Sequence, residues 1–463
     1  MPPTPETDPA IPDGLPQPRR NWATVAVAFA IVMAVMDGAI ANVALPTLAR
    51  DLGVSPAESI WVANSYQLTI AVLLLPMAAL GEIVGYRRIY LGGLVVFLLG
   101  SVACTLSNSL PTLVAGRVVQ ALGAAGLMAI NTALIRYIYP RALLGRGIGI
   151  NAVIVATSSA LGPTVAGGIL AVASWPWLFA VNVPLGLAAL ALGWRSLPES
   201  HRARRPFDVI SAVLCALFFG LLVTGIDALG HGASWGWLAA QFLATVLIGT
   251  VLVRRQLGMR APLLPLDLLR IPIFALSVGT SVCSFLAMML AYSSLPFHLQ
   301  SGFGFDAVDT GLIMTPWPLA TAVVAPIAGR LADRHSAGLL GGLGLLVLAA
   351  GLSALALLPA QPSVVAIAWP MAVCGAGFGL FQSPNNRTLI SAAPRERSGG
   401  AGGMLSTART LGQTLGTALV ALILARAPQE GPVIALWVGA AVALVAAGIS
   451  SLRLLPGGRN GAG

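Results

Sequence analysis

Long apolar runs follow one another along this chain, separated by short loops that contain arginine. A helix needs about 20 apolar residues to cross the hydrocarbon core of a bilayer, which is about 30 Å thick. Because lipid offers no hydrogen bonds to the backbone, a spanning segment must be a helix or part of a closed barrel. The runs lack the two-residue alternation of barrel strands, so they predict spanning helices. Charged residues make up 9% of the chain, against about 25% in soluble domains, which agrees with lipid as the main solvent.

The runs predict an all-α integral membrane protein with fourteen transmembrane helices. The first six spans are expected at 22–45, 58–80, 89–108, 111–135, 147–172 and 177–194. Two more are expected at 208–228 and 237–253, and the last six at 272–297, 309–329, 337–359, 363–387, 401–424 and 431–452.

The arginines predict the orientation of these spans. All 26 basic residues are arginine. If the N-terminus is cytoplasmic, 22 of them fall in cytoplasmic loops and tails, Arg50 and Arg426 fall outside, and Arg117 and Arg409 fall within spans. Cytoplasmic loops carry an excess of positive charge, so both termini are expected in the cytoplasm, with the protein in the cell (inner or plasma) membrane.

Composition also excludes several kinds of chemistry. Without lysine there is no phosphate-binding Walker A motif, so this chain is not expected to use ATP. Cys104, Cys215, Cys283 and Cys374 lie in apolar runs, and the four histidines show no metal-ligand spacing. No set of catalytic residues is recognisable, and the arginines lie in short loops rather than in a nucleic-acid-binding patch. We therefore expect no enzyme activity, metal, cofactor or nucleic-acid partner.

Two loops indicate an internal repeat. Residues 81–88 follow the second span, and residues 329–334 follow the tenth; both contain an acid and arginines at a helix end. This predicts a tail at 1–21, a six-helix bundle at 22–194, a linker at 195–271 with two extra helices, a second six-helix bundle at 272–452 and a tail at 453–463. We expect the first tail to be disordered and both to be cytoplasmic. Parallel repeats of this kind are a transporter architecture, with the substrate between the halves.

Several motifs resemble those of the major facilitator superfamily, in particular its branch of 14-span drug:proton antiporters. Asp37 followed by Asn42-Val43-Ala44-Leu45-Pro46 resembles the signature of the first span in that branch. Trp61 and Tyr66 are similar to the start of its second span, and Arg117 with Gln120 resembles the Arg-x-x-Gln motif of span four. Further matches are Gly162-Pro163 with Gly167 in span five, Trp175–Phe179, and Asn182-Val183-Pro184 with Gly186 in span six. The resemblance implies the superfamily fold, two six-helix bundles plus two inserted helices, and proton as coupling ion.

Asp37 and Arg117 are the candidate proton-coupling residues. A carboxylate inside a spanning helix costs about 3 kcal/mol on insertion scales, so such residues mark ion or proton paths by default. At 1.5 Å per residue both side chains are expected roughly 10–12 Å below the outer surface, where they can pair. The alternatives are an acid near the outer interface that snorkels or caps a helix, a static pair, and an Arg117 held by backbone carbonyls and polar neighbours.

The loop after span two resembles the superfamily gating motif, with Glu82 in place of its Asp and Ile83 in place of its usual Arg. The candidate gating residues are Gly81, Glu82, Gly85, Arg87, Arg88, Asp333 and Arg334. Their charges can latch one conformation at helix ends, or act only in setting topology.

Gly162, Pro163 and Gly167 form the candidate antiporter motif, because small residues and proline allow close helix approach and bending. Ordinary helix packing is the alternative. The candidate substrate-cavity residues are Asn42, Trp61, Tyr66, Gln67, Gln120, Asn131, Asn151 and Arg409.

The function that these residues favour is proton-coupled efflux of lipophilic, cationic compounds by alternating access, by a monomer in the bilayer. An exporter of an endogenous metabolite, or a uniporter of the same fold, is the alternative, since the spans hold few acids besides Asp37. A sensor or scaffold would need a soluble domain or long cytoplasmic loops, and none is recognisable.

Overall fold

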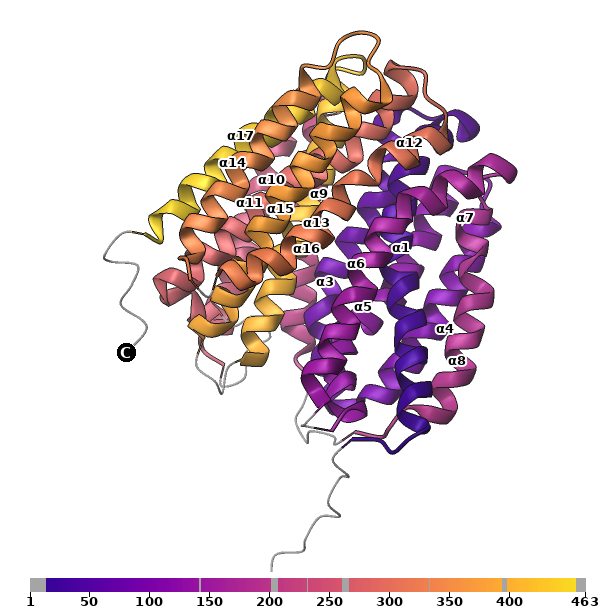
Figure 1. Cartoon of the computed structure of the whole chain (residues 1–463), viewed down its shortest axis with the longest axis vertical. Coiled ribbons are helices and arrows are strands. Elements are labelled where there is room, and N and C mark those ends of the chain that lie inside the picture. The colour runs from indigo at the N-terminus through magenta and orange to yellow at the C-terminus, as the bar shows by residue number, and fades with distance from the viewer. Residues whose placement is uncertain are drawn as a thin grey trace, which may run out of the picture.

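The computed structural model describes residues 14–140, 143–200, 207–230, 232–259, 266–332, 334–393 and 398–454. In these ranges every regular element is a helix, and the long helices pack side by side (Figure 1). The first half contains α1 (Arg19–Leu52), α2 (Pro56–Ser59), α3 (Trp61–Val84), α4 (Tyr86–Thr105), α5 (Leu110–Ile138), α6 (Leu144–Val172), α7 (Trp177–Ala180) and α8 (Asn182–Ser196). Then come α9 (Val209–Gly230), α10 (Trp235–Leu257) and the short η2 (Leu266–Arg270). The second half contains α11 (Pro272–Phe297), η3 (His298–Gly302), α12 (Ala307–Met314), α13 (Pro316–Leu331), α14 (Ala337–Ala356), α15 (Val364–Ala392), α16 (Ser398–Arg426) and α17 (Gly431–Leu452).

The prediction of fourteen spans is confirmed. Thirteen helical segments are long and apolar enough to cross a membrane, and α6, with 29 residues, supplies the fourteenth. Four spans consist of two helical pieces: α2 with α3, α7 with α8, α11 with η3, and α12 with α13. The prediction had no breaks within spans, and its span at 272–297 ends before η3. The tenth span breaks at Thr315, directly before Pro316. Proline has no N–H group and so cannot continue the helical hydrogen bonds.

The first helix begins earlier than predicted. α1 starts at Arg19, and the backbone N–H of Leu15 donates a hydrogen bond to Ile138 O (3.0 Å) at the end of α5. The expected tail at 1–21 therefore includes an ordered part, residues 14–21, that packs on the first bundle; residues 1–13 lie outside the described ranges.

Both ends of the described chain lie at one end of the helix bundle. We call this the termini side, where α1 begins at Arg19 and α17 ends at Leu452. The opposite side is where α1 ends at Leu52 and α17 begins at Gly431. In Figure 1 the opposite side is uppermost.

The two halves repeat the same helix contacts. α4 and α14 have 20 residues each, and α5 and α15 have 29 each. Gly93 and Gly344 occupy the same place along α4 and α14, as Gly123 and Gly377 do along α5 and α15. A Cβ atom on Gly123 would lie 2.4 Å from Gly93 O, and one on Gly377 would lie 2.6 Å from Gly344 O. Small residues at matching places thus bring each helix pair into direct backbone contact.

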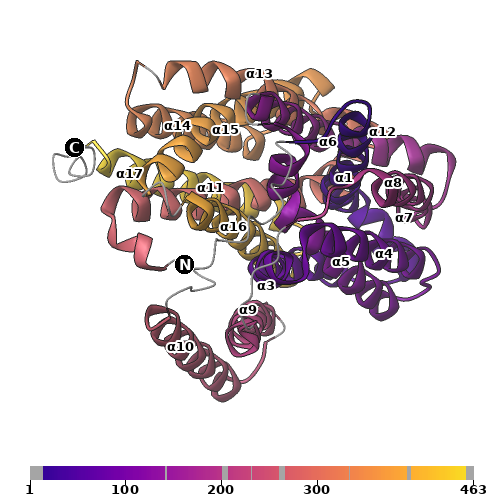
Figure 2. The ribbon, with the colours of Figure 1, turned by 90° about the horizontal axis from the view of Figure 1, so that it is seen from below.

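The inserted helices α9 and α10 form a hairpin outside the two bundles (Figure 2). Arg255 pairs with Asp208 (3.0 Å), and Gln256 Nε2 donates to Ser211 Oγ (2.6 Å). Burial raises the pKa of Asp208, but hydrogen bonds from Ser211 and Arg255 outweigh it and hold the pKa below its ordinary value. α9 packs on α3 of the first half and α16 of the second, whereas α10 packs mainly on α9. The hairpin therefore covers one of the seams between the halves.

Candidate transport site

Asp37 lies in the middle of α1 and is 1% exposed. Its Oδ1 accepts hydrogen bonds from Gln120 Nε2 and Asn182 Nδ2, each at 2.9 Å. Its Oδ2 is paired with Arg117 Nη1. A buried carboxylate is costly unless it is paired and hydrogen-bonded, and these three partners meet that condition.

Arg117 of α5 is 0% exposed, so its charge needs partners within the protein. Besides Asp37, its Nε donates to Val62 O (3.0 Å) and its Nη1 to Gln120 Oε1 (2.6 Å). The guanidinium carbon lies 4.1 Å from the centre of the Tyr66 ring, which is a cation–π distance. The remaining nitrogen, Nη2, has no hydrogen-bond partner among the described residues.

Close packing of α4 on α5 positions Gln120 in this network. A Cβ atom on Gly100 would lie 2.3 Å from Gln120 N, so only glycine allows the two helices to approach so closely. Gln120 Nε2 also donates to Ser101 Oγ (2.9 Å). The network thus joins α1, α3, α4, α5 and α8, and all five helices belong to the first half.

The network can exist in two charge states. With Asp37 ionised, the carboxylate and guanidinium neutralise each other. A proton on Asp37 removes the attraction and leaves Arg117 as a buried unpaired cation, so protonation must be accompanied by rearrangement of its surroundings.

Among the hydrogen bonds between described residues, three join the two halves near the opposite side. Ser293 Oγ of α11 donates to Asn42 Oδ1 (3.2 Å), and Gln300 Nε2 donates to Val43 O (3.0 Å). The hydroxyls of Thr164 and Thr315 lie 2.6 Å apart. Hydrogen bonding between the bundles within the described ranges is therefore concentrated at one end of the molecule.

The predicted antiporter motif lies at this same end. Gly311 of α12 packs on Pro163 of α6, since a Cβ atom on Gly311 would lie 2.3 Å from Pro163 O. A Cβ atom on Gly167 would lie 2.8 Å from Ala307 O. Gly162 instead faces α1, since a Cβ atom on Gly162 would lie 2.5 Å from Ala39 Cβ. Two of the three motif residues thus contact the other half, and the third holds α6 on α1.

The predicted gating residues of the first half lie on the termini side, around the turn between α3 and α4. Gly85 has φ 108° and makes the tight turn between α3 and α4, and Gly81 packs directly on Ile130. Arg87 donates to Trp194 O (2.5 Å) and lies 3.7 Å from Glu199.

The other members of the gating set give less information. Arg88 and Arg334 are exposed, and Glu82 is half-buried near the end of α3. Asp333 lies outside the described residues.

The predicted cavity residues do not share one location. Tyr66 and Gln120 are buried in the Asp37 network, and Asn42 lies at the contact between the halves. Asn131 Nδ2 donates to Asn151 Oδ1 (2.9 Å) between α5 and α6. A polar residue in an apolar run can either bind a ligand or be satisfied by hydrogen bonds within the protein, and the sequence does not distinguish these roles. Most of the predicted cavity residues are hydrogen-bonded within the protein.

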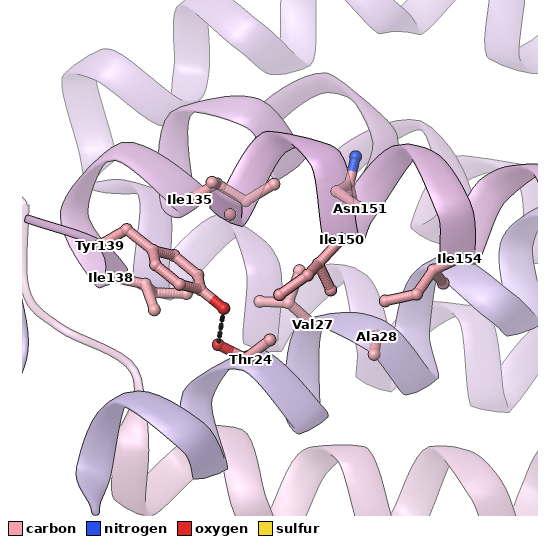
Figure 3. Close-up of a pocket in the computed structure, with 10 residues that line it drawn as sticks. Thr24, Val27, Ala28, Ile135, Ile138, Tyr139, Ile150, Asn151 and Ile154 are labelled. Carbon is pink, nitrogen blue, oxygen red and sulfur yellow. Dashed lines mark hydrogen bonds between the residues drawn. The ribbon is translucent and has the colours of Figure 1, made fainter. Parts of the chain in front are cut away.

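The pocket beside Asn151 is too small for a substrate. It lies between α1, α5 and α6, where Thr24 donates to Tyr139 Oη (3.1 Å), as Figure 3 shows. Its volume of about 10 Å³ is that of about one water molecule.

The remaining candidates, Trp61, Gln67 and Arg409, are half-buried. Within the described part of the chain, no hydrogen bond or ion pair reaches the Arg409 side chain, in contrast to Arg117.

Sequence reasoning missed two sets of residues. Asn182, quoted only as part of a motif, is a direct partner of Asp37. Arg453, counted as a loop arginine, is 5% exposed; it donates to Asn385 Oδ1 (2.9 Å), Ser277 Oγ (3.2 Å) and Thr280 Oγ1 (3.2 Å). Those partners are distant in sequence, so no local pattern indicates the cluster. Among the described residues, no group of three His, Cys, Asp or Glu side chains could hold a metal ion.

Fourteen spanning helices in two repeated bundles, with a buried charge network between helices, define a multi-pass membrane transporter. The family model of the Major Facilitator Superfamily matches residues 27–417. The chain belongs to the major facilitator superfamily, as the motifs indicated. It is not an enzyme.

Similar proteins support this assignment. The chain is 57% identical to the uncharacterized transporter YebQ of Escherichia coli over 96% of this chain and 97% of the relative. It is 30% identical to the riboflavin transporter RibZ of Clostridioides difficile (86% and 87% covered), and 34% identical to the multidrug resistance protein Stp of Mycobacterium tuberculosis (87% and 75% covered). A bacterial homologue of the lysosomal transporter Spinster has the same fold, with a TM-score of 0.69 at 16% identity over 95% of this chain and 97% of that one.

Proposed function

We propose that this transporter is a proton-coupled antiporter that exports small lipophilic compounds by alternating access. The observation that carries the proposal is the buried Asp37–Arg117 pair, whose carboxylate oxygens are saturated by Arg117, Gln120 and Asn182. A proton on Asp37 and the charge of Arg117 compete for the same carboxylate, so loading and unloading of the proton is tied to the structure of the first half.

Helix α1 provides a physical link from this network to the contact between the halves. Asn42 Nδ2 donates to Gly38 O (2.9 Å), one residue after Asp37, and Asn42 Oδ1 accepts from Ser293 of the second half. On another face of α1, Ala39 packs against Gly162 of α6. A shift of α1 on protonation would therefore act on the contacts between the halves by two routes, directly through Asn42 and indirectly through α6.

We assign the termini side to the cytoplasm, on the basis of the arginine distribution. The contacts between the halves then close the extracellular side, so this conformation is the one that takes up its cargo or releases its proton on the cytoplasmic side. One proton that enters down a 100 mV gradient supplies about 2.3 kcal/mol for export.

Two kinds of cargo are consistent with the relatives. Similarity to the multidrug resistance protein Stp supports export of foreign compounds, and similarity to the riboflavin transporter RibZ supports movement of a metabolite. A uniporter with this fold would have no need of the Asp37–Arg117 pair, and so the pair favours exchange with protons.

The test is flux in proteoliposomes that carry a pH gradient, with a trapped pH dye to follow proton movement. We expect the gradient to accelerate transport in the wild type and to have no effect in Asp37→Asn, because an amide cannot carry the proton. Asp51→Asn is the matched control, since Asp51 lies on the same helix at an exposed end. Gradient-driven transport at the wild-type rate in Asp37→Asn would refute the proposal.

A further inference from the structure

Arg409 of the second half differs from the buried arginines Arg117 and Arg453, because no hydrogen bond or ion pair with the described residues holds its side chain. Arg409 lies in α16, eleven residues after its first residue and 17 before its last, or about 16 Å and about 25 Å from the two ends. A charge at such a depth is costly and normally faces a partner or a water-filled cavity. Its side chain is half-buried and makes no hydrogen bond or ion pair with the described residues.

Arg409 belongs to a polar stripe on one face of α16. Ser406 and Gln413 lie three and four residues away, so their side chains project from the same face. Both are half-buried, and within the described ranges their side-chain polar atoms have no hydrogen-bond partner. A guanidinium, a carboxamide and a hydroxyl thus present free donors along about two turns of helix.

The packing of α16 places this stripe away from its apolar contacts. α16 packs on α11 through Gly412, whose Cβ would lie 2.4 Å from Val282 O, and approaches α3 near Leu75 through Gly403 (3.1 Å). The stripe lies between these two faces, and Leu411 lies on the opposite face of the helix. Figure 2 shows α16 near the middle of the molecule, and α16 packs on both α3 and α11. The stripe therefore lies where the two halves meet, near the middle of the membrane.

The charge balance at this place is positive. Of the ionisable side chains described in the interior of the spans, Asp37 is paired with Arg117 and Arg409 has no counter-charge. Glu58, on the α2 segment that α16 also contacts, accepts from Ser55 at the opposite side (2.7 Å). A cationic cargo would meet repulsion here, whereas an anion would neutralise the guanidinium through charge-assisted hydrogen bonds.

We propose that Arg409, with Ser406 and Gln413, binds the acidic group of the cargo, and that the cargo is an aromatic or otherwise apolar carboxylate. This inference rests on the proposed proton exchange and names its substrate class. It replaces the cationic compound that the sequence favoured with an organic anion.

Exchange of an anion for a proton has an electrical consequence. When one anion leaves and one proton enters, two charges cross the membrane in the same electrical sense. An inside-negative potential therefore accelerates the cycle. Exchange of a monovalent cation for one proton moves no net charge and responds to the pH gradient alone.

The test compares three probes that share one aromatic body: 1-naphthoate, its methyl ester and (1-naphthylmethyl)trimethylammonium. We expect the purified wild type to bind naphthoate best, and Arg409→Gln to weaken that binding by about 10- to 100-fold, as for loss of a hydrogen bond to a charged group. Arg409→Lys should retain part of the affinity, and binding of the ester should change little. Arg254→Gln, at the exposed end of α10, is the matched control.

Flux in proteoliposomes separates this proposal from the exchange function. An inside-negative membrane potential is imposed with potassium and valinomycin. Naphthoate export that this potential accelerates, and that is lost in Arg409→Gln, supports both the anion site and the exchange function. Absence of naphthoate binding, wild-type affinity in Arg409→Gln, or pH-driven movement of the ammonium probe alone overturns the anion site. Arg409-dependent naphthoate binding with flux that ignores the pH gradient overturns the exchange function and leaves the anion site standing.

Discussion

A methyl group added at the contact between the halves should change which side of the transporter is open. A Cβ atom on Gly311 would lie 2.3 Å from Pro163 O, and one on Gly167 would lie 2.8 Å from Ala307 O. Both contacts are to backbone atoms of the other half, so the halves must separate there to accommodate alanine. Overpacking of this kind costs about 1–3 kcal/mol. Because the cost falls only on the conformation in which these surfaces touch, Gly311→Ala should shift the equilibrium about 5- to 150-fold toward opening of the opposite side.

Spin labels can measure this shift. Asn108, after α4, and Gln361, after α14, are exposed on the opposite side of the two halves. With labels at these positions, in a background without the four native cysteines, the population at longer distance should grow in Gly311→Ala and in Gly167→Ala.

Two neighbouring glycines serve as controls. Gly168→Ala should leave the distances unchanged, because nothing lies within 4 Å of a Cβ atom there. Gly162→Ala should lower stability without favouring either conformation, because its contact, Ala39, belongs to the same half. An unchanged distance distribution in a folded Gly311→Ala protein would refute the reasoning.

Three further predictions concern stability. Asp37→Asn should destabilise the protein by about 3–5 kcal/mol, because it leaves Arg117 unpaired. In thermal or steric-trap unfolding, the double variant Asp37→Asn/Arg117→Gln should recover part of that loss. An equal loss of stability in the single and double variants would contradict this. Arg453→Met should lower the free energy of unfolding by about 2 kcal/mol, since it leaves buried acceptors on Asn385 and Ser450 unpaired. An unchanged melting temperature would show that these acceptors find other partners. The pKa of Asp208 is held below its ordinary value of 3.8, so the contribution of the ionised carboxylate to stability is complete above about pH 4 and is lost at lower pH. The difference in melting temperature between the wild type and Asp208→Asn should therefore shrink between about pH 6 and pH 3.

The sequence predicts the spans because their cause is local. Hydrophobic runs of sufficient length must cross the bilayer, and so the count of fourteen follows from composition. The breaks within spans, such as that at Thr315, depend on how the pieces pack against other helices, and hydropathy does not report this.

The candidate site, like the fold, has a part that the sequence predicts and a part that depends on packing. A buried acid and a buried arginine at similar depth are expected to meet, and Asp37 and Arg117 do. The contribution of Asn182 depends on the rotation of α8, and the burial of Arg453 depends on hydroxyl groups from α11 and α17. Neither has a signal in the neighbouring sequence, because each arises from contacts between residues more than 60 positions apart or from the orientation of a whole helix.

The repeated glycine contacts of α4 with α5 and of α14 with α15 show how the two copies of the bundle differ. At the places that Arg117 and Gln120 occupy in α5, α15 carries Met371 and Cys374, both buried. The backbone scaffold was thus kept in both copies, while the charge network stands in only one of them. The copies are therefore not interchangeable: at matching places of the same helix pair, the first holds a buried arginine and glutamine that reach Asp37, and the second holds a buried methionine and cysteine.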